Sequence, residues 1–146
     1  MVLVSINKIL QYKNPLVIQR FKQAFPDKAH RAEELWINML KYLWLCKKHE
    51  QDVELNPHLS HLQFSCVMHQ EMRDMDEMWH AFILITKDYA DFCHNYFGEF
   101  LHHVPNIREE IVQSEEEFER ELHLYLSYVY DQLGEETLKL WFSEYL

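Results

Sequence analysis

The sequence is poor in the residues that interrupt regular structure. It has only 2 glycines and 4 prolines among 146 residues, and these are the types that mark turns. A sandwich or barrel of short strands needs many such turns, so helices are favoured. The composition, 48% hydrophobic and 26% charged, is typical of a globular protein. We therefore predict one all-α domain over residues 1–146, a bundle of about five to six helices.

Long apolar runs and a dense cysteine pattern are also missing. No stretch approaches the roughly 20 apolar residues that cross a bilayer, and the first ten residues resemble no signal peptide. Three cysteines are an odd number and argue against a disulfide framework. We expect a cytoplasmic protein without membrane segments, in which Cys46 and Cys66 are small apolar fillers.

Positive charge is scarce as well. Lys and Arg number 14 against 24 Asp and Glu, so the formal net charge is −10. This charge repels phosphate backbones and anionic lipid headgroups, which argues against nucleic acid as a partner.

Apolar residues at intervals of three and four predict the helices. Asn14 and Pro15 are typical of a helix start, Gly98 and Gly134 of helix ends, and Ser114 of an N-cap. Residues 51–61 and 99–107 are predicted to be connections. The predicted helices cover residues 15–25, 28–50, 62–85, 87–97, 115–133 and 135–146.

A cluster of metal-ligand residue types begins on the third predicted helix and continues beyond it. Asp76 and His80 lie one helical turn apart on the same face, and His69 shares that face further back. Cys93 can join them only if the chain turns near residues 86–88, and the histidines of the 99–107 connection can then fold over the site. Carboxylate, imidazole and thiolate together suit zinc or another transition metal. The predicted ligands are Asp76, His80, Cys93 and His103, with His69 and His102 as substitutes.

Two other interpretations of these residues remain open. In one, Trp79 and Cys93 are core residues, His80 is buried against Asp76, and the two histidines of the connection cap a helix or face solvent. In the other, Cys93 is a nucleophile activated by His80 or His103, although an apolar setting would raise rather than lower its pKa.

The same segment resembles the glycine-rich domain-containing protein-like family of uncharacterised helical regions. Weaker similarity extends over about residues 36–142. The resemblance implies an all-α fold and a site shared by Asp76, His80, Cys93 and His103, but no established activity, and the chain lacks the glycine-rich part of that family. The matching positions are Asp76, Trp79, His80, Leu84, Tyr89, Cys93, Gly98 and His103.

The sequence contains no phosphate-binding glycine loop and no complete catalytic motif. Our leading hypothesis is therefore a non-enzymatic module that binds another protein or regulates it, with a structural metal as an additional feature. The alternative is a small metal-dependent enzyme that uses the Asp/His/Cys/His site. The second alternative is a structural or oligomerisation domain; the sequence leaves the oligomeric state open.

Overall fold

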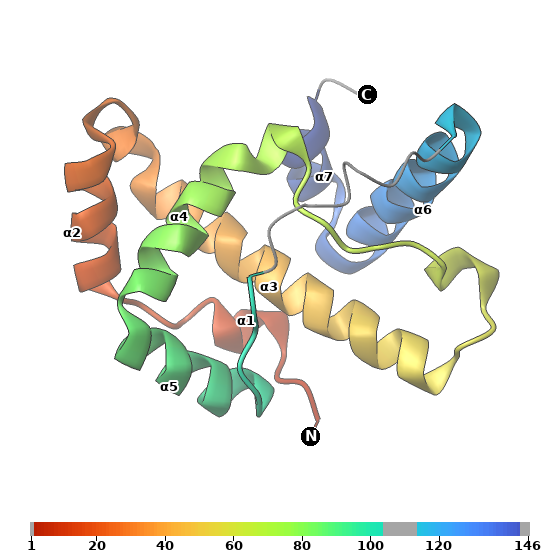
Figure 1. The fold of residues 1–146 in the computed structure, drawn as a ribbon, viewed down its shortest axis with the longest axis horizontal. Helices are drawn as coiled ribbons and strands as arrows, with labels where there is room; N and C mark the ends of the chain where they lie inside the picture. Colours follow the sequence, from red (N-terminus) through yellow and green to blue (C-terminus); the bar gives the residue numbers. More distant parts are fainter. Residues whose placement is uncertain (1, 104–113, 144–146) are drawn as a thin grey trace.

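One long helix, α3, runs through the middle of the molecule, and the other helices pack around it (Figure 1). This computed structural model describes residues 2–103 and 114–143. In these residues it has seven α-helices and no strand, so the all-α prediction is confirmed and the helix number is slightly above the predicted one. The helices are α1 (Ile6–Ile9), α2 (Pro15–Ala24), α3 (Ala32–Leu55), α4 (Arg73–Leu84), α5 (Thr86–Phe97), α6 (Glu115–Leu133) and α7 (Glu135–Phe142).

The arrangement follows from the apolar surface of α3. This helix is buried on most sides, and it packs directly against α1, α2, α4 and α6. Helix α5 packs on α4, and α7 packs on α6. Across the described ranges no helix combines the length and apolarity needed to traverse a bilayer.

Several helix ends are those predicted from the sequence. The Asn14 side chain accepts a hydrogen bond from the Val17 amide at the start of α2, with Pro15 in the first helical position. Ser114 Oγ accepts from the Glu117 amide, 3.1 Å away, at the start of α6. Gly98 ends α5 with φ = 75°, a left-handed conformation that glycine adopts without strain.

The region before α4 differs from the prediction. The helix predicted over residues 62–85 begins only at Arg73, after short 3-10 helices η2 (Ser60–Leu62) and η3 (Gln70–Met72). Between these, residues 65–69 are not helical because side chains of α3 hold the backbone there: the Tyr42 hydroxyl donates to the Cys66 carbonyl. His69 consequently does not share the face of Asp76 and His80.

Other boundaries shift by less. Helix α3 starts later than predicted, since Pro26–Arg31 form a 3-10 helix, η1, and it continues to Leu55 into the predicted 51–61 connection. The short helix α1 was not predicted. The connection predicted over 99–107 is described only to residue 103, and the last three residues of the helix predicted over 135–146 lie outside the described part.

Each of the 4 tryptophans combines an apolar ring with one satisfied polar atom. All lie in the core, and each indole N–H donates a hydrogen bond to another segment of the chain. These bonds join the N-terminal segment and α7 to α3, and α5 to α4. The pairs are Trp36 with the Tyr12 carbonyl, Trp44 with the Val4 carbonyl, Trp79 with the Tyr89 hydroxyl and Trp141 with Asn38 Oδ1.

Candidate metal centre

Helix α4 supplies two of the candidate ligands. Its buried face carries Met75, Met78, Trp79 and Phe82, which fixes the rotation of the helix. The neighbouring face therefore points away from the core, with Asp76 partly exposed and the His80 side chain 54% exposed. The carboxylate and the imidazole lie one turn apart, and the distance from His80 Nε2 to Asp76 Oδ2 is 3.8 Å.

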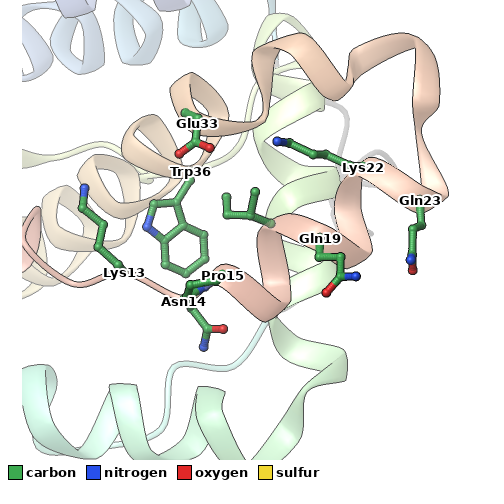
Figure 2. Close-up of a pocket in the computed structure, with 9 residues that line it drawn as sticks. Lys13, Asn14, Pro15, Gln19, Lys22, Gln23, Glu33 and Trp36 are labelled. Carbon is green, nitrogen blue, oxygen red and sulfur yellow. The ribbon is translucent and has the colours of Figure 1, made fainter.

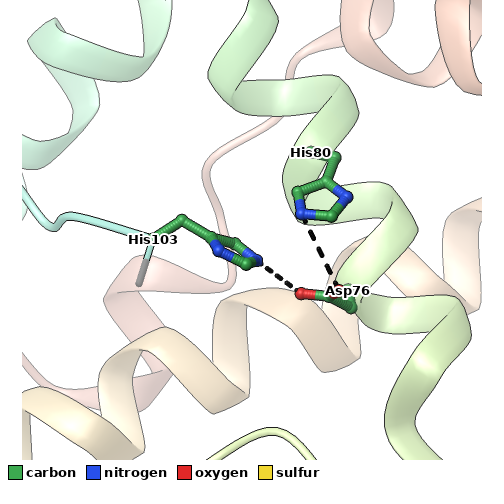
Figure 3. Close-up of side chains that lie close together, drawn as sticks. All are labelled: Asp76, His80 and His103. Carbon is green, nitrogen blue, oxygen red and sulfur yellow. Dashed lines mark hydrogen bonds and ion pairs between the residues drawn. The ribbon is translucent and has the colours of Figure 1, made fainter. Parts of the chain in front are cut away.

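The third candidate ligand, His103, comes from the segment that follows α5. Its Nε2 atom lies 2.6 Å from Asp76 Oδ1, and its side chain is only 17% exposed. The imidazole also packs against Trp79, with 4.3 Å between the ring centroids. Figure 3 shows both histidines directed at Asp76, one from its own helix and one from the segment after α5, and the two imidazole centroids are 4.4 Å apart.

Two hydrogen bonds hold the His103 segment in place. The Tyr89 hydroxyl accepts a bond from Trp79 Nε1 at 3.0 Å and donates one to the Leu101 carbonyl at 2.6 Å. This hydroxyl thus connects α4, α5 and the segment that carries His103. Burial raises the pKa of Tyr89 well above its usual value, so the hydroxyl stays protonated and able to donate.

The neighbouring carboxylates of α4 are already paired. Asp74 accepts hydrogen bonds from Lys28 and Arg31, and Glu77 accepts one from Lys28. Burial alone would raise the pKa of Asp74, but the two cations more than offset this and lower it below its usual value. Among the described residues, the ion pairs of Asp76 are instead with His80 and His103, so no lysine or arginine there competes for its carboxylate.

The structure brings together three of the four predicted ligands. One ligand atom each of Asp76, His80 and His103 lies within 4.8 Å of the other two, and Cys93 is not in this group. Cys93 is fully buried on α5, where burial raises the pKa of its thiol. Such a thiol is a poor nucleophile at neutral pH, which argues against the interpretation of Cys93 as a catalytic nucleophile.

The two substitute ligands lie elsewhere. His69 contacts the rings of Phe118, Tyr125 and Phe142 on α6 and α7, and burial lowers its pKa. His102 is exposed and packs on Phe100. The core interpretation is right for Trp79 and Cys93 but wrong for His80, which is exposed rather than buried.

The supporting residues were less visible in the sequence. Tyr89 is among the pattern residues of the resemblance, yet no spacing rule identifies its bond to Leu101. Lys28 and Arg31, which neutralise Asp74, lie more than forty residues away along the chain. No periodic pattern connects residues at such a distance, so only the fold reveals these contacts.

A surface pocket, separate from the candidate centre, lies between α2 and the start of α3 (Figure 2). Its volume is about 580 Å³, and the buried ring of Trp36 lies on one side of it. The lining contains two lysines, one glutamate and two glutamines but no histidine or cysteine, so it offers no metal-ligand set or nucleophile–base pair. The lining residues are Lys13, Asn14, Pro15, Ile18, Gln19, Lys22, Gln23, Glu33 and Trp36.

The chemistry of the candidate centre follows from its donors. Two imidazoles and one carboxylate are the usual ligands of zinc sites with an open coordination position, and also of non-haem iron sites. A tetrahedral ion with bonds near 2.0 Å separates its ligand atoms by about 3.3 Å. In the structure one ligand atom of each of the three residues lies within 4.8 Å of the other two. Binding an ion would therefore require side-chain rotations that bring these atoms to the tetrahedral spacing.

The described residues thus form an all-α fold in which Asp76, His80 and His103 lie close together near the surface. The chain belongs to the UCP032817-like family, an uncharacterised family whose model matches residues 9–129. No curated protein and no solved structure matches the chain.

This family corrects the resemblance described above. The match spans most of the chain, whereas the resemblance depended on eight positions within residues 76–103. Nothing in the comparison indicates a glycine-rich domain-containing family, so that assignment was wrong. Eight spaced residues in one helix pair and the segment after it are too short a pattern to separate one helical family from another.

Proposed function

We propose that this protein is a small metal-binding domain that holds a divalent transition metal through Asp76, His80 and His103. The observation that carries the proposal is the convergence of these three side chains from two segments of the chain. His80 is the exposed member, so the site opens toward solvent on its side. The net charge of −10 favours the approach of a cation.

The hydrogen bond between His103 and Asp76 has an ordinary explanation as a tie between segments. The metal hypothesis differs in what it requires of His80, which lies 3.8 Å from the carboxylate and is half exposed. A structural tie needs only Asp76 and His103. A metal centre needs His80 as well, and this difference can be tested.

The test is equilibrium dialysis of the untagged protein against zinc, followed by metal analysis by plasma mass spectrometry. We expect about one zinc ion per chain in the wild type, as in other three-ligand zinc sites. His80→Ala and Asp76→Asn should remove most of it. Iron(II), dialysed without oxygen, is the second metal to compare because the same ligand set suits it.

Two variants are matched controls. His102→Ala removes an exposed histidine next to His103 and should leave zinc binding unchanged. Cys93→Ala should also retain the metal, because Cys93 is outside the ligand group. Wild-type protein without zinc, or equal losses in His102→Ala and His80→Ala, would contradict the proposal.

A metal-dependent enzyme is the second candidate. Three protein ligands leave a coordination position for water, and zinc lowers the pKa of such a water to about 7. The exposure of His80 gives a substrate access to that position. Zinc-dependent hydrolysis of an activated ester, abolished by His80→Ala, would favour this candidate over a purely binding role.

We also retain the proposal of a protein partner and a cytoplasmic location. Leu84 is 72% exposed one turn from His80 on α4, and Phe100 is 46% exposed before His103. Apolar side chains beside the open site suit contact with another protein. The odd number of cysteines, three, argues against a disulfide framework and is consistent with a reducing compartment.

A further inference from the structure

A pair of thiols lies apart from the candidate metal centre. Cys46 is on α3 and Cys66 is in the connection before α4, yet their Sγ atoms are 2.7 Å apart. Neither is in a disulfide, and each residue as a whole is partly exposed, whereas the Cys66 thiol itself is buried. The sequence predicts both to be small apolar fillers. They are twenty residues apart and lie on two different predicted helices.

The contact is built by the backbone as well as by the two side chains. Three residues along one side of α3, Tyr42, Cys46 and His49, bond to carbonyls of the connection. Tyr42 donates to the Cys66 carbonyl at 3.4 Å, Cys46 Sγ lies 3.7 Å from the same oxygen, and His49 Nε2 lies 2.9 Å from the Leu62 carbonyl. These contacts hold Cys66 against α3 on both sides of the sulfur pair.

We propose that Cys46 and Cys66 are a redox modification site that forms a reversible disulfide, with a low-molecular-weight disulfide as the oxidant. A disulfide bond is about 2.05 Å long. The sulfur atoms therefore need to approach by less than about 1 Å, and the extended connection at residues 65–69 can supply this movement.

The exchange balances in two steps. The thiolate of one cysteine attacks the small disulfide, forms a mixed disulfide and releases one small thiolate. The second cysteine then attacks the protein sulfur of that mixed disulfide and releases the second small thiolate. The two protons of the protein thiols pass to the released thiolates, so the protein is oxidised by two electrons and the small disulfide is reduced to two thiols.

The surroundings of the two cysteines determine how fast they undergo thiol–disulfide exchange. The buried rings of Tyr42 and Tyr125 flank the sulfur atoms. Burial raises the pKa of the Cys66 thiol well above its usual value. Exchange should therefore be slow at neutral pH and faster as the pH rises. Once formed, the bond closes residues 46–66 into a loop and joins α3 to the segment that leads into α4.

The test uses full-length wild-type protein equilibrated with oxidised glutathione as the probe, then unfolded and alkylated with N-ethylmaleimide. Reduced protein should take up three alkyl groups, one for each cysteine. Oxidised protein should take up one, and its intact mass before alkylation should be lower by two hydrogen atoms. Peptide mapping without reductant should show Cys46 linked to Cys66, and the oxidised form should unfold at a higher temperature.

Variants make the assignment specific. Cys93→Ser is the control and should still form the bond, whereas Cys46→Ser and Cys66→Ser should leave only mixed disulfides with glutathione. Wild-type protein that keeps three alkylatable thiols under oxidation would overturn the proposal. So would a linked peptide that contains Cys93. The wild-type peptide map decides the matter even where a variant fails to fold.

Discussion

The Tyr89 hydroxyl connects three segments, and its removal gives a direct measure of what holds the His103 segment. Tyr89→Phe keeps the buried ring but removes both the acceptor for Trp79 Nε1 and the donor to the Leu101 carbonyl. Trp79 is only 8% exposed, so water can hardly replace the lost acceptor. Leu101 is partly exposed, so water can reach its carbonyl more easily.

The expected cost follows from these two bonds. A hydrogen bond contributes about 1 kcal/mol net, and a buried donor left unpaired costs about 1–3 kcal/mol. We therefore expect Tyr89→Phe to lower the free energy of unfolding by about 2–3 kcal/mol. In a chain of this size that corresponds to a fall in Tm of roughly 6–12 °C. Zinc affinity should fall as well, because His103 loses its support while all three candidate ligands remain.

The assay is urea unfolding followed by circular dichroism, with zinc dialysis on the same samples. Trp79→Phe is the comparison, because it removes the bond from Trp79 Nε1, keeps an aromatic ring against His103 and leaves Tyr89 joined to Leu101. Its zinc binding should be closer to that of the wild type. A loss below about 1 kcal/mol in Tyr89→Phe, with unchanged zinc binding, would refute the positioning role.

Two further predictions concern a helix end and the loss of stability at acid pH. Gly98→Ala should lower the free energy of unfolding by about 1–2 kcal/mol because φ is 75° there, whereas Gly98→Asn should cost less; thermal unfolding measures both. The pKa of Asp74 is lower in the folded protein than in the unfolded chain, because Lys28 and Arg31 pair with its carboxylate. The pairing therefore stabilises the fold fully above the unfolded pKa of about 3.9. This stabilisation is lost as the pH falls through the folded pKa. Because the carboxylate is partly exposed, we expect this contribution to the free energy of unfolding to be about 1 kcal/mol. In urea unfolding between about pH 6 and 2, the free energy of unfolding of Asp74→Asn should fall less with decreasing pH than that of the wild type.

Local signals explain which parts of the fold could be predicted. Asn14 with Pro15, Gly98 and Ser114 each act on the nearest turn of a helix, and the structure places a helix end at each of them. The helix predicted over 62–85 failed because the interval between Met68 and Met72 fits a helix as well as it fits this connection. There, bonds from α3 to the backbone outweigh local helix propensity.

The sequence predicted the part of the candidate centre that lies on a single helix. Asp76 and His80 are one turn apart in any helix, so their proximity needs no knowledge of the fold. The position of His103 depends on where the chain goes after Gly98, and Cys93 depends on the rotation of α5. That rotation is set by Tyr89, Phe92 and Phe97, which turn the same face, Cys93 included, into the core.

Both sites of the molecule are built in the same way. One half lies on a helix at a spacing that the sequence shows: Asp76 with His80 on α4, and Cys46 with its neighbouring residues on α3. The other half lies on a non-helical connection, and a tyrosine hydroxyl that donates to a backbone carbonyl holds it there. These bonds fix the backbone of each connection, so that the side chains of His103 and Cys66 lie against Asp76 and Cys46 on the helices. The connections therefore complete both proposed sites, which the helices alone would leave with one half each.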